Sequence, residues 1–154
     1  MAGFKTTYIT KLTDVDTTDK EGVGTLRWEG GKCYKYVKFV DASDTAVVGD
    51  GLGYVADAYP ENTVCADITD MDAQCIPAGV AVAAITATNS WAWIQIKGLV
   101  VVAAAFNGTT PAQGDTLFLL TTDKTFTVDP TVNTRAAGIL SHVANKEMIL
   151  DCPF

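Results

Sequence analysis

The feature that most restricts the fold is a series of short strand-like runs, separated by turn residues, that fills the chain from Val64 onward. These runs are rich in β-branched and aromatic residues, and Asn, Gly, Pro and Asp stand between them. We expect strands at 65–68, 79–87, 91–96, 99–106, 116–120, 125–128, 136–143 and 147–152. Strands of this length, recurring roughly every 8 to 12 residues, predict an all-β fold: a small sandwich or barrel of short antiparallel strands.

The run from Trp91 to Phe106 holds the strongest strand signal. Trp91 and Trp93 fall on one face by alternation, whereas the residues from Leu99 onward are apolar at every position. Such a run predicts a strand covered on both sides, and Gly98 predicts a bulge or a sharp bend between two core strands. The run is far shorter than the roughly 18 apolar residues of a membrane helix, so we expect no membrane partner.

The first part of the chain divides into an arm, a hairpin and a loop region. Residues 1–22 are polar and predict an extended arm, with one short strand at 7–12, that is loose or orders against a partner. A single β domain is expected over 23–154. It comprises a hairpin at 24–40 that turns at Gly30 and Gly31, a long loop region at 41–76 with short strands, and a β core at 79–154.

Charge and composition argue against several classes of function. The 154-residue chain has a net charge of −7, which repels phosphate and makes nucleic-acid binding an unfavourable interpretation. Its first residues contain no apolar stretch of signal-peptide length, so no secretory leader is expected. The four cysteines lack zinc-site spacing, and we expect reduced, buried thiols. A bridge between Cys65 and Cys75 stays open for a protein that works outside a cell.

No group of residues predicts catalysis, a metal or a cofactor. The glycines at 49, 51 and 53 lack the spacing and context of a phosphate-binding loop, and the acidic clusters at 14–21 and 67–72 lack the pattern of a calcium loop. His142 is the single histidine, and no nucleophile motif accompanies it. We therefore expect a protein that is not an enzyme.

Aromatic and basic residues alternate in the hairpin. Tyr34 and Tyr36 share one face of the second strand, and Lys35, Val37 and Phe39 share the other, so neither face is clearly exposed to solvent. A strand between its own core and another subunit has this pattern, because Trp and Tyr are enriched at interfaces. The residues expected to form an interface with another molecule are Phe4, Tyr8, Arg27, Trp28, Tyr34, Tyr36 and Lys38.

Residues 79–154 resemble small all-β head decoration (cement) proteins of tailed double-stranded DNA phages. The similarity lies in a strand with a central glycine at 91–100, Pro-Ala-Gln-Gly-Asp-Thr-Leu-Phe at 111–118, a Lys/Thr hairpin at 123–127, Ala-Gly-Ile-Leu at 137–140 and a closing strand. The hairpin at 24–39 is similar to the amino-terminal part of marine phage virion proteins. The polar arm and the segment 41–76 depart from the short members of the family.

The resemblance implies a non-catalytic protein that binds the major capsid protein on the outer surface of the phage head, usually as a homotrimer at three-fold positions. It implies location in the virion, and in the host cytoplasm during assembly. Two other interpretations stay open: a carbohydrate- or receptor-binding module of a tail or fibre that uses Trp28 or Trp91 as a stacking platform, and a small enzyme with a pocket around His142.

Overall fold

The computed structural model describes residues 7–41, 44–55, 62–66, 76–108, 110–120, 124–129 and 135–152. Within these ranges the chain forms eleven strands and no helix, and none of its segments is a helix able to span a membrane. The predicted all-β class is confirmed. The strands are β1 (Val15–Asp16), β2 (Leu26–Glu29), β3 (Lys32–Phe39), β4 (Gly51–Tyr54), β5 (Thr63–Cys65), β6 (Pro77–Ala81), β7 (Ser90–Val101), β8 (Thr116–Leu119), β9 (Phe126–Thr127), β10 (Ala136–His142) and β11 (Glu147–Asp151).

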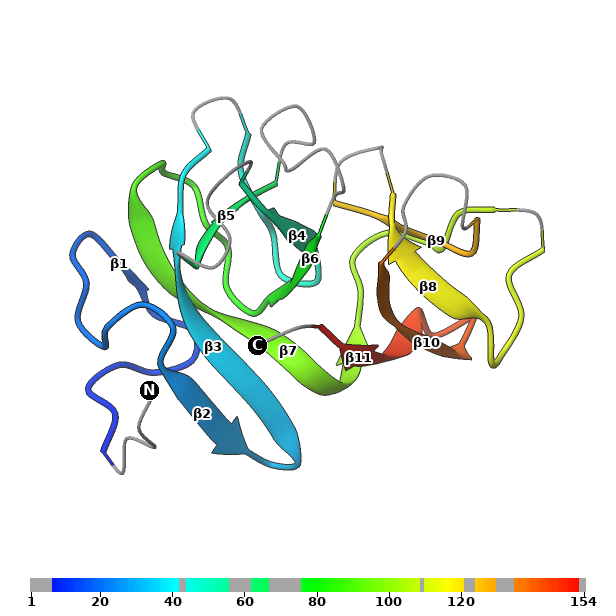
Figure 1. Ribbon diagram of the computed structural model, residues 1–154, viewed down its shortest axis with the longest axis horizontal. Coiled ribbons are helices and arrows are strands. Elements are labelled where there is room, and N and C mark those ends of the chain that lie inside the picture. The colour runs from blue at the N-terminus through cyan, green and yellow to red at the C-terminus, as the bar shows by residue number, and fades with distance from the viewer. Residues whose placement is uncertain are drawn as a thin grey trace.

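Five of the strands close into a barrel, on the left of Figure 1. The order around the barrel is β3-β5-β4-β6-β7, and pairing of β7 with β3 completes the ring. Four of the five pairings are antiparallel and β3–β5 is parallel, whereas the sequence predicted antiparallel strands throughout. Alternation along β3 sends Val37 and Phe39 into the core and Tyr34 and Tyr36 to the outer face, as predicted.

Strand β7 belongs to the barrel and to a second sheet. Residues 90–97 pair with β3, and residues 97–101 pair with β11. Between these two parts the register with β3 shifts opposite Cys33 and Tyr34, and Gly98 takes a φ of 95°. The bulge therefore lies between Gln95 and Lys97, just before Gly98, where the prediction had put a bulge or bend, and β7 is one continuous strand rather than two.

The amide of Gln95 stabilises this bulge. Its Nε2 donates to the carbonyl oxygens of Lys97 (3.2 Å), Gly98 (3.2 Å) and Leu99 (3.0 Å), which the irregular backbone turns toward one point. The Gln95 side chain is buried, so these bonds replace those that water would otherwise supply. One polar side chain thus lets a single strand leave the barrel and enter the second sheet.

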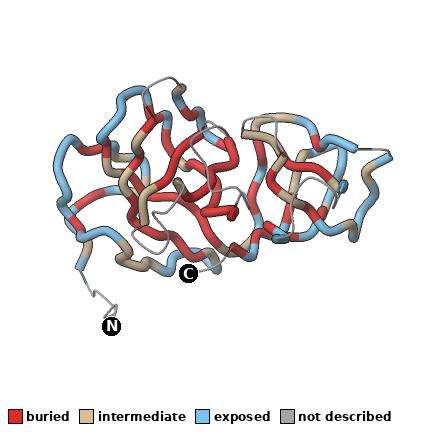
Figure 2. Tube along the Cα trace, turned by 45° about the horizontal axis from the view of Figure 1, so that its top comes forward, coloured by how far each residue is buried: buried red, intermediate tan, exposed pale blue. Residues whose placement is uncertain are grey.

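The second sheet has the order β7-β11-β10-β8-β9 and lies on the right of Figure 1. Its inner face packs against the barrel: a Cβ on Gly51 would lie 2.7 Å from Leu119 Cδ1 and 2.8 Å from Phe126 Cζ, so the two parts are in close contact there. Leu117, Leu140, Met148 and Leu150 fill the same face and join the barrel's hydrophobic core. Figure 2 accordingly shows buried segments in both parts of the molecule.

The region 41–76, where short strands were predicted, supplies β4 and β5, and both belong to the barrel. One prediction about the arm needs correction. The strand expected at 7–12 does not form; the strand of the arm is β1, which pairs with β7 at Ala92 and Trp91. The described part of the arm, from residue 7 onward, is therefore attached to the barrel instead of extended.

Candidate binding surfaces

An aromatic cluster covers the outer face of the barrel beneath the arm. Tyr8 meets Trp93 edge-on, with ring centroids 5.5 Å apart, and Tyr36 lies 5.2 Å from Trp93 on the other side. Tyr36 and Trp93 are fully buried. The outer face of β3, whose pattern predicted contact with another subunit, is thus covered by the protein's own arm.

Hydrogen bonds fix the arm over this cluster. Trp93 Nε1 donates to the Thr10 hydroxyl oxygen at 2.8 Å, and that hydroxyl donates to Glu21 Oε1 at 2.9 Å. The same Glu21 oxygen accepts from the backbone amides of Ile9 and Thr10, both at 2.6 Å. The Glu21 carboxylate therefore closes residues 9–21 into a loop above the buried indole.

Two of the predicted interface residues take part in this anchoring. The Tyr36 hydroxyl donates to Asp16 Oδ2 at 2.9 Å, and burial together with the Asp16 carboxylate raises the pKa of Tyr36 well above its usual range. The Arg27 guanidinium lies 4.9 Å from the Tyr8 ring centroid and donates to the Thr10 carbonyl at 3.0 Å. In this protein both side chains hold the arm in place.

Trp28 is the predicted interface residue that extends furthest into solvent. Its side chain is 52% exposed on β2, an edge strand, and alternation places it on the opposite face from Arg27. Gly30 and Gly31, both with positive φ, form the tight turn that follows. Tyr34 is buried, Lys38 lies 5.5 Å over the Trp91 ring, and Phe4 is outside the described residues. The predicted residues therefore do not form one surface.

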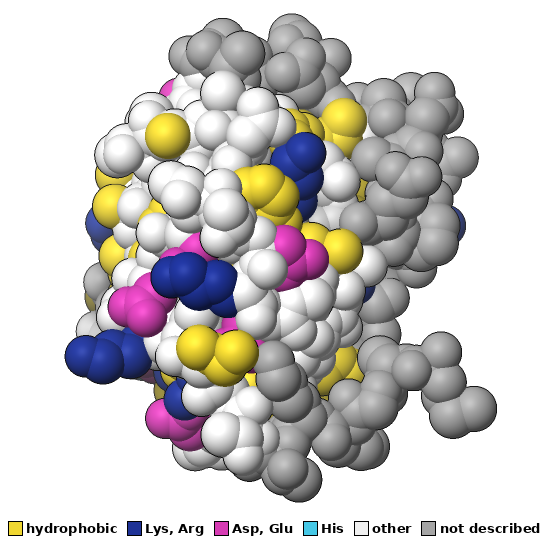
Figure 3. All heavy atoms as spheres, turned by 90° about the vertical axis from the view of Figure 1, so that its left-hand side faces the viewer, with side chains coloured by type: hydrophobic (Ala, Val, Ile, Leu, Met, Phe, Trp, Pro, Cys, Tyr) yellow, Lys and Arg dark blue, Asp and Glu magenta, His cyan; other side chains and the backbone are white. Residues whose placement is uncertain are grey.

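Charges of both signs are interspersed on the side of the molecule that carries the arm. Figure 3 shows basic and acidic side chains next to one another there, with hydrophobic side chains in small separate groups. Arg27 pairs with Glu29 and Lys20 pairs with Asp16, each at 2.5 Å. No broad basic surface is visible from this side.

A lysine lies inside the barrel. The Lys35 side chain points to the core face of β3, is 4% exposed, and donates from Nζ to the Tyr54 hydroxyl at 2.8 Å. Burial lowers the pKa of Lys35 to about 8, because the charged amine loses its hydration. The sequence pattern placed Lys35 on the face of Val37 and Phe39, but it gave no sign of this electrostatic cost.

An exposed aliphatic surface covers the outer side of the second sheet. Leu99 and Val101 of β7, Ile149 of β11 and Ile139 of β10 are between 47% and 58% exposed, and we call these four residues the aliphatic face. The sequence predicted that the run after Gly98 is covered on both sides. That prediction is wrong for Leu99 and Val101: of the described residues of this run, Val100, Val102 and Phe106 lie in the core.

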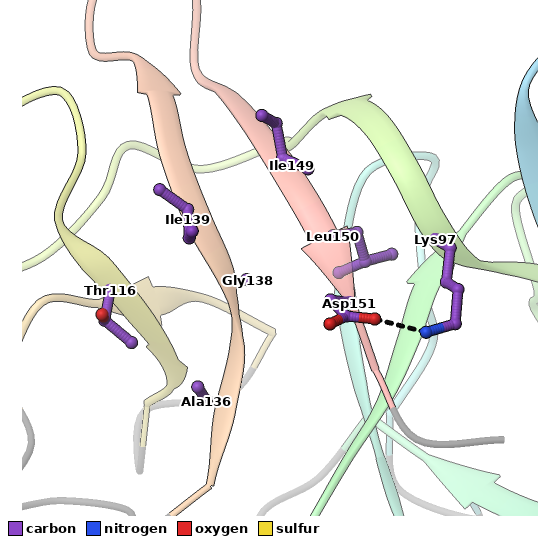
Figure 4. Close-up of a pocket in the computed structure, with 8 residues that line it drawn as sticks. All are labelled: Lys97, Thr116, Ala136, Gly138, Ile139, Ile149, Leu150 and Asp151. Carbon is purple, nitrogen blue, oxygen red and sulfur yellow. Dashed lines mark hydrogen bonds and ion pairs between the residues drawn. The ribbon is translucent and has the colours of Figure 1, made fainter.

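A groove of about 540 Å³ adjoins the aliphatic face. Figure 4 shows Ile139 and Ile149 on neighbouring strands, Gly138 and Ala136 beside them, and the ion pair of Lys97 with Asp151 at the far end. A Cβ at Gly138 would collide with the Ile149 carbonyl, so β10 and β11 lie in close contact beside the groove. The groove is lined mainly by apolar residues, with the ion pair of the partly exposed Lys97 and the exposed Asp151 at its edge.

The residues considered for chemistry are not gathered into a reactive site within the described ranges. His142 is exposed, and its Nδ1 accepts from the Asn145 amide at 3.2 Å. No three potential metal ligands cluster in that part of the chain. Cys33 and Cys152 are buried thiols whose pKa is raised by burial, and Cys65 is buried; Cys75 is outside the described residues, so the Cys65–Cys75 bridge stays untested.

These features define the class: an all-β protein with a closed five-stranded barrel, an anchored arm and a second sheet with a bare aliphatic face. Comparisons with protein-family models, with curated proteins and with solved structures found no match. The function therefore has to be argued from the surfaces themselves.

Proposed function

We propose that the protein is a capsid decoration (cement) protein that binds the outer surface of a tailed phage head and stabilises the shell. The proposal comprises the major capsid protein as partner, self-association as a homotrimer, location on the virion surface, and no catalytic activity or cofactor. Its support is the resemblance of residues 24–39 and 79–154 to phage virion proteins, together with one structural observation, the exposed indole of Trp28 on an anchored hairpin.

The hairpin is suited to rigid binding. One face of β2 and β3 is fixed by the aromatic cluster, and Tyr8 donates from its hydroxyl to the Leu26 carbonyl at 2.8 Å. Trp28 extends from the other face, and its backbone pairs with that of Cys33 in β3. A pre-ordered aromatic side chain loses little conformational entropy on binding, and tryptophan is the residue type most enriched at binding hot spots.

Several copies on one shell would strengthen modest contacts. A symmetric oligomer engages neighbouring capsid subunits together, so each further contact forms at a high effective concentration. A stable shell could then be obtained without a large interface in each copy.

Co-sedimentation with expanded, undecorated capsids tests the proposal. We expect wild-type protein to sediment with the capsids at micromolar concentration and to raise their resistance to heat. Trp28→Ala is expected to weaken binding at least tenfold, which corresponds to about 1.4 kcal/mol. Val48→Ala is the matched control, because Val48 is similarly exposed but lies away from the hairpin. Absence of wild-type protein from the pellet would refute the proposal.

The second candidate is a carbohydrate- or receptor-binding module of a tail or fibre. The same exposed Trp28 favours it, since an indole face stacks on sugar rings. Saturable quenching of tryptophan fluorescence by a glycan, abolished by Trp28→Ala and preserved in Val48→Ala, would support this candidate over the first.

A further inference from the structure

The aliphatic face is a continuous row across three strands. Register places Leu99 opposite Ile149, and Ile149 opposite Ile139, so the three side chains stand next to one another on the same side of the sheet. Their chain neighbours Val100, Met148 and Leu150 are buried on the other side. A sheet that is apolar on both faces is the usual pattern of a sheet covered on both faces.

Local charge favours a second copy of the chain as the covering partner. The protein as a whole carries −7, which makes two copies repel each other over most approaches. Among the described residues next to the aliphatic face, charges of both signs occur in equal number at each end. Lys97 pairs with Asp151 at one end, and Lys146 and Glu147 are consecutive residues at the other. Two copies that meet here avoid the excess of acid that separates them elsewhere.

We propose that the aliphatic face binds the same face of a second copy, about a two-fold axis that runs parallel to β7 and β11 and between them. Such an axis preserves position along the strands and exchanges β7 with β11. Leu99 of one copy then packs on Ile149 of the other, and Lys97 of each copy faces Asp151 of the other. The contact is self-complementary at Leu99 and Ile149 and in charge at Lys97 and Asp151, and it places Val101 against Glu147 of the other copy.

The ion pair at the edge is the most selective part of this arrangement. Lys97 Nζ already binds Asp151 Oδ1 within one chain, and the two-fold axis brings a second, reversed pair above it. The four charges then alternate in sign, so each is closest to charges of the opposite sign. An axis perpendicular to the strands, with β11 over β11, would instead bring Asp151 against Glu147 of the other copy. Charge thus selects between the two geometries.

Sedimentation velocity over a range of protein concentrations tests this contact. As concentration rises, wild-type protein is expected to reach twice the mass that it has at low concentration, which is 16.3 kDa for a monomer and three times that for the proposed homotrimer. The double variant Leu99→Thr/Ile149→Thr keeps two β-branched residues in the strands and should weaken association at least tenfold. Val47→Thr/Val48→Thr removes comparably exposed aliphatic surface elsewhere and should behave as wild type.

A charge-complementation experiment tests the geometry separately. Lys97→Asp and Asp151→Lys, each alone, place like charges together in a dimer and should associate less than wild type. An equimolar mixture of the two variants restores opposite charges across the axis, and it should form the mixed dimer. Circular dichroism of each variant verifies that the strands are retained, and recovery in the mixture shows that neither variant has simply unfolded.

The inference is overturned if wild-type protein stays monomeric at all concentrations, if Leu99→Thr/Ile149→Thr associates as wild type does, or if the mixture associates no better than its components. It does not rest on the proposed function. A trimer that is unaffected by these variants would refute the two-fold contact and leave the capsid-binding proposal intact. A dimer that does not sediment with capsids would support the two-fold contact and refute capsid binding.

Discussion

Lys35 provides a direct test of how the barrel core tolerates charge. Its amine is buried among apolar side chains with the Tyr54 hydroxyl as a hydrogen-bond partner, and its pKa falls from 10.5 to about 8. Each unit of pKa shift corresponds to about 1.4 kcal/mol, so holding the charged form in the core costs at most about 3 kcal/mol at neutral pH. Lys35→Met removes this cost and keeps a side chain of similar length.

The expected net gain at pH 7 is smaller than the electrostatic cost. Losing the bond to Tyr54 and the contact with its ring offsets about 1 to 2 kcal/mol, which leaves Lys35→Met more stable than wild type by about 1 to 2 kcal/mol. The stability advantage of Lys35→Met over wild type must disappear as the pH rises. Between pH 8 and 10.5 the unfolded chain holds a proton on Lys35 that the folded chain has lost, so wild-type stability rises relative to the variant through this window.

Urea unfolding from pH 7 to pH 9.5 measures the effect. The difference in unfolding free energy between the two proteins should change by about 2 kcal/mol between pH 8 and pH 9.5. Buried cysteines and tyrosines with raised pKa, such as Cys33 and Tyr36, lower stability at alkaline pH in both proteins and cancel in the difference. Lys38→Met, on the outer face of the same strand, is the control. A difference that does not vary with pH would refute the reasoning.

Three further substitutions test the arm and the bulge by chemical denaturation. Thr10→Ala should cost about 1 to 3 kcal/mol because it leaves the buried Trp93 Nε1 without its acceptor, whereas Thr10→Ser should be nearly neutral; equal losses from both would contradict the role of the hydroxyl. Gly98→Ala should destabilise the protein more than Gly114→Ala does. Both glycines have a φ of 95°, but only at Gly98 would an added Cβ come close to backbone, 3.0 Å from a carbonyl oxygen. The reverse order would show that packing around Gly98 is loose. Gln95→Met should cost about 1 to 3 kcal/mol by leaving the bulge carbonyls unsatisfied, and a neutral result would mean that water reaches them.

Much of the β architecture follows from local sequence. The hairpin turn at Gly30 and Gly31, the strands from β8 to β11 and the irregular backbone near Gly98 were all predictable, because turn chemistry and alternation act over a few residues. The closure of the barrel was not. It depends on parallel pairing of β3 with β5 and on the pairing of β3 with β7, contacts between distant segments that leave no local pattern.

The candidate surfaces were harder to predict than the strands. Alternation showed that β3 has two apolar faces, but it does not say whether an arm of the same chain or another molecule covers the second one. The structure places Tyr8 there and leaves Trp28 exposed. For β7 the sequence predicted more burial than the structure shows. Leu99 and Val101 are apolar and were expected to be buried, but the part of the chain that the structure describes leaves them half exposed.

The double membership of β7 bears on how the protein folds. The strand pairs with β1 near one end of the chain and with β11 near the other, and it also completes the barrel with β3. Few of these contacts are local. Forming them requires closing long loops, which costs chain entropy before the packing of the strands stabilises the fold. Proteins dominated by such contacts fold in milliseconds to seconds rather than microseconds. We therefore expect slow refolding, with β7 unprotected against hydrogen exchange until strands from both halves of the chain have met.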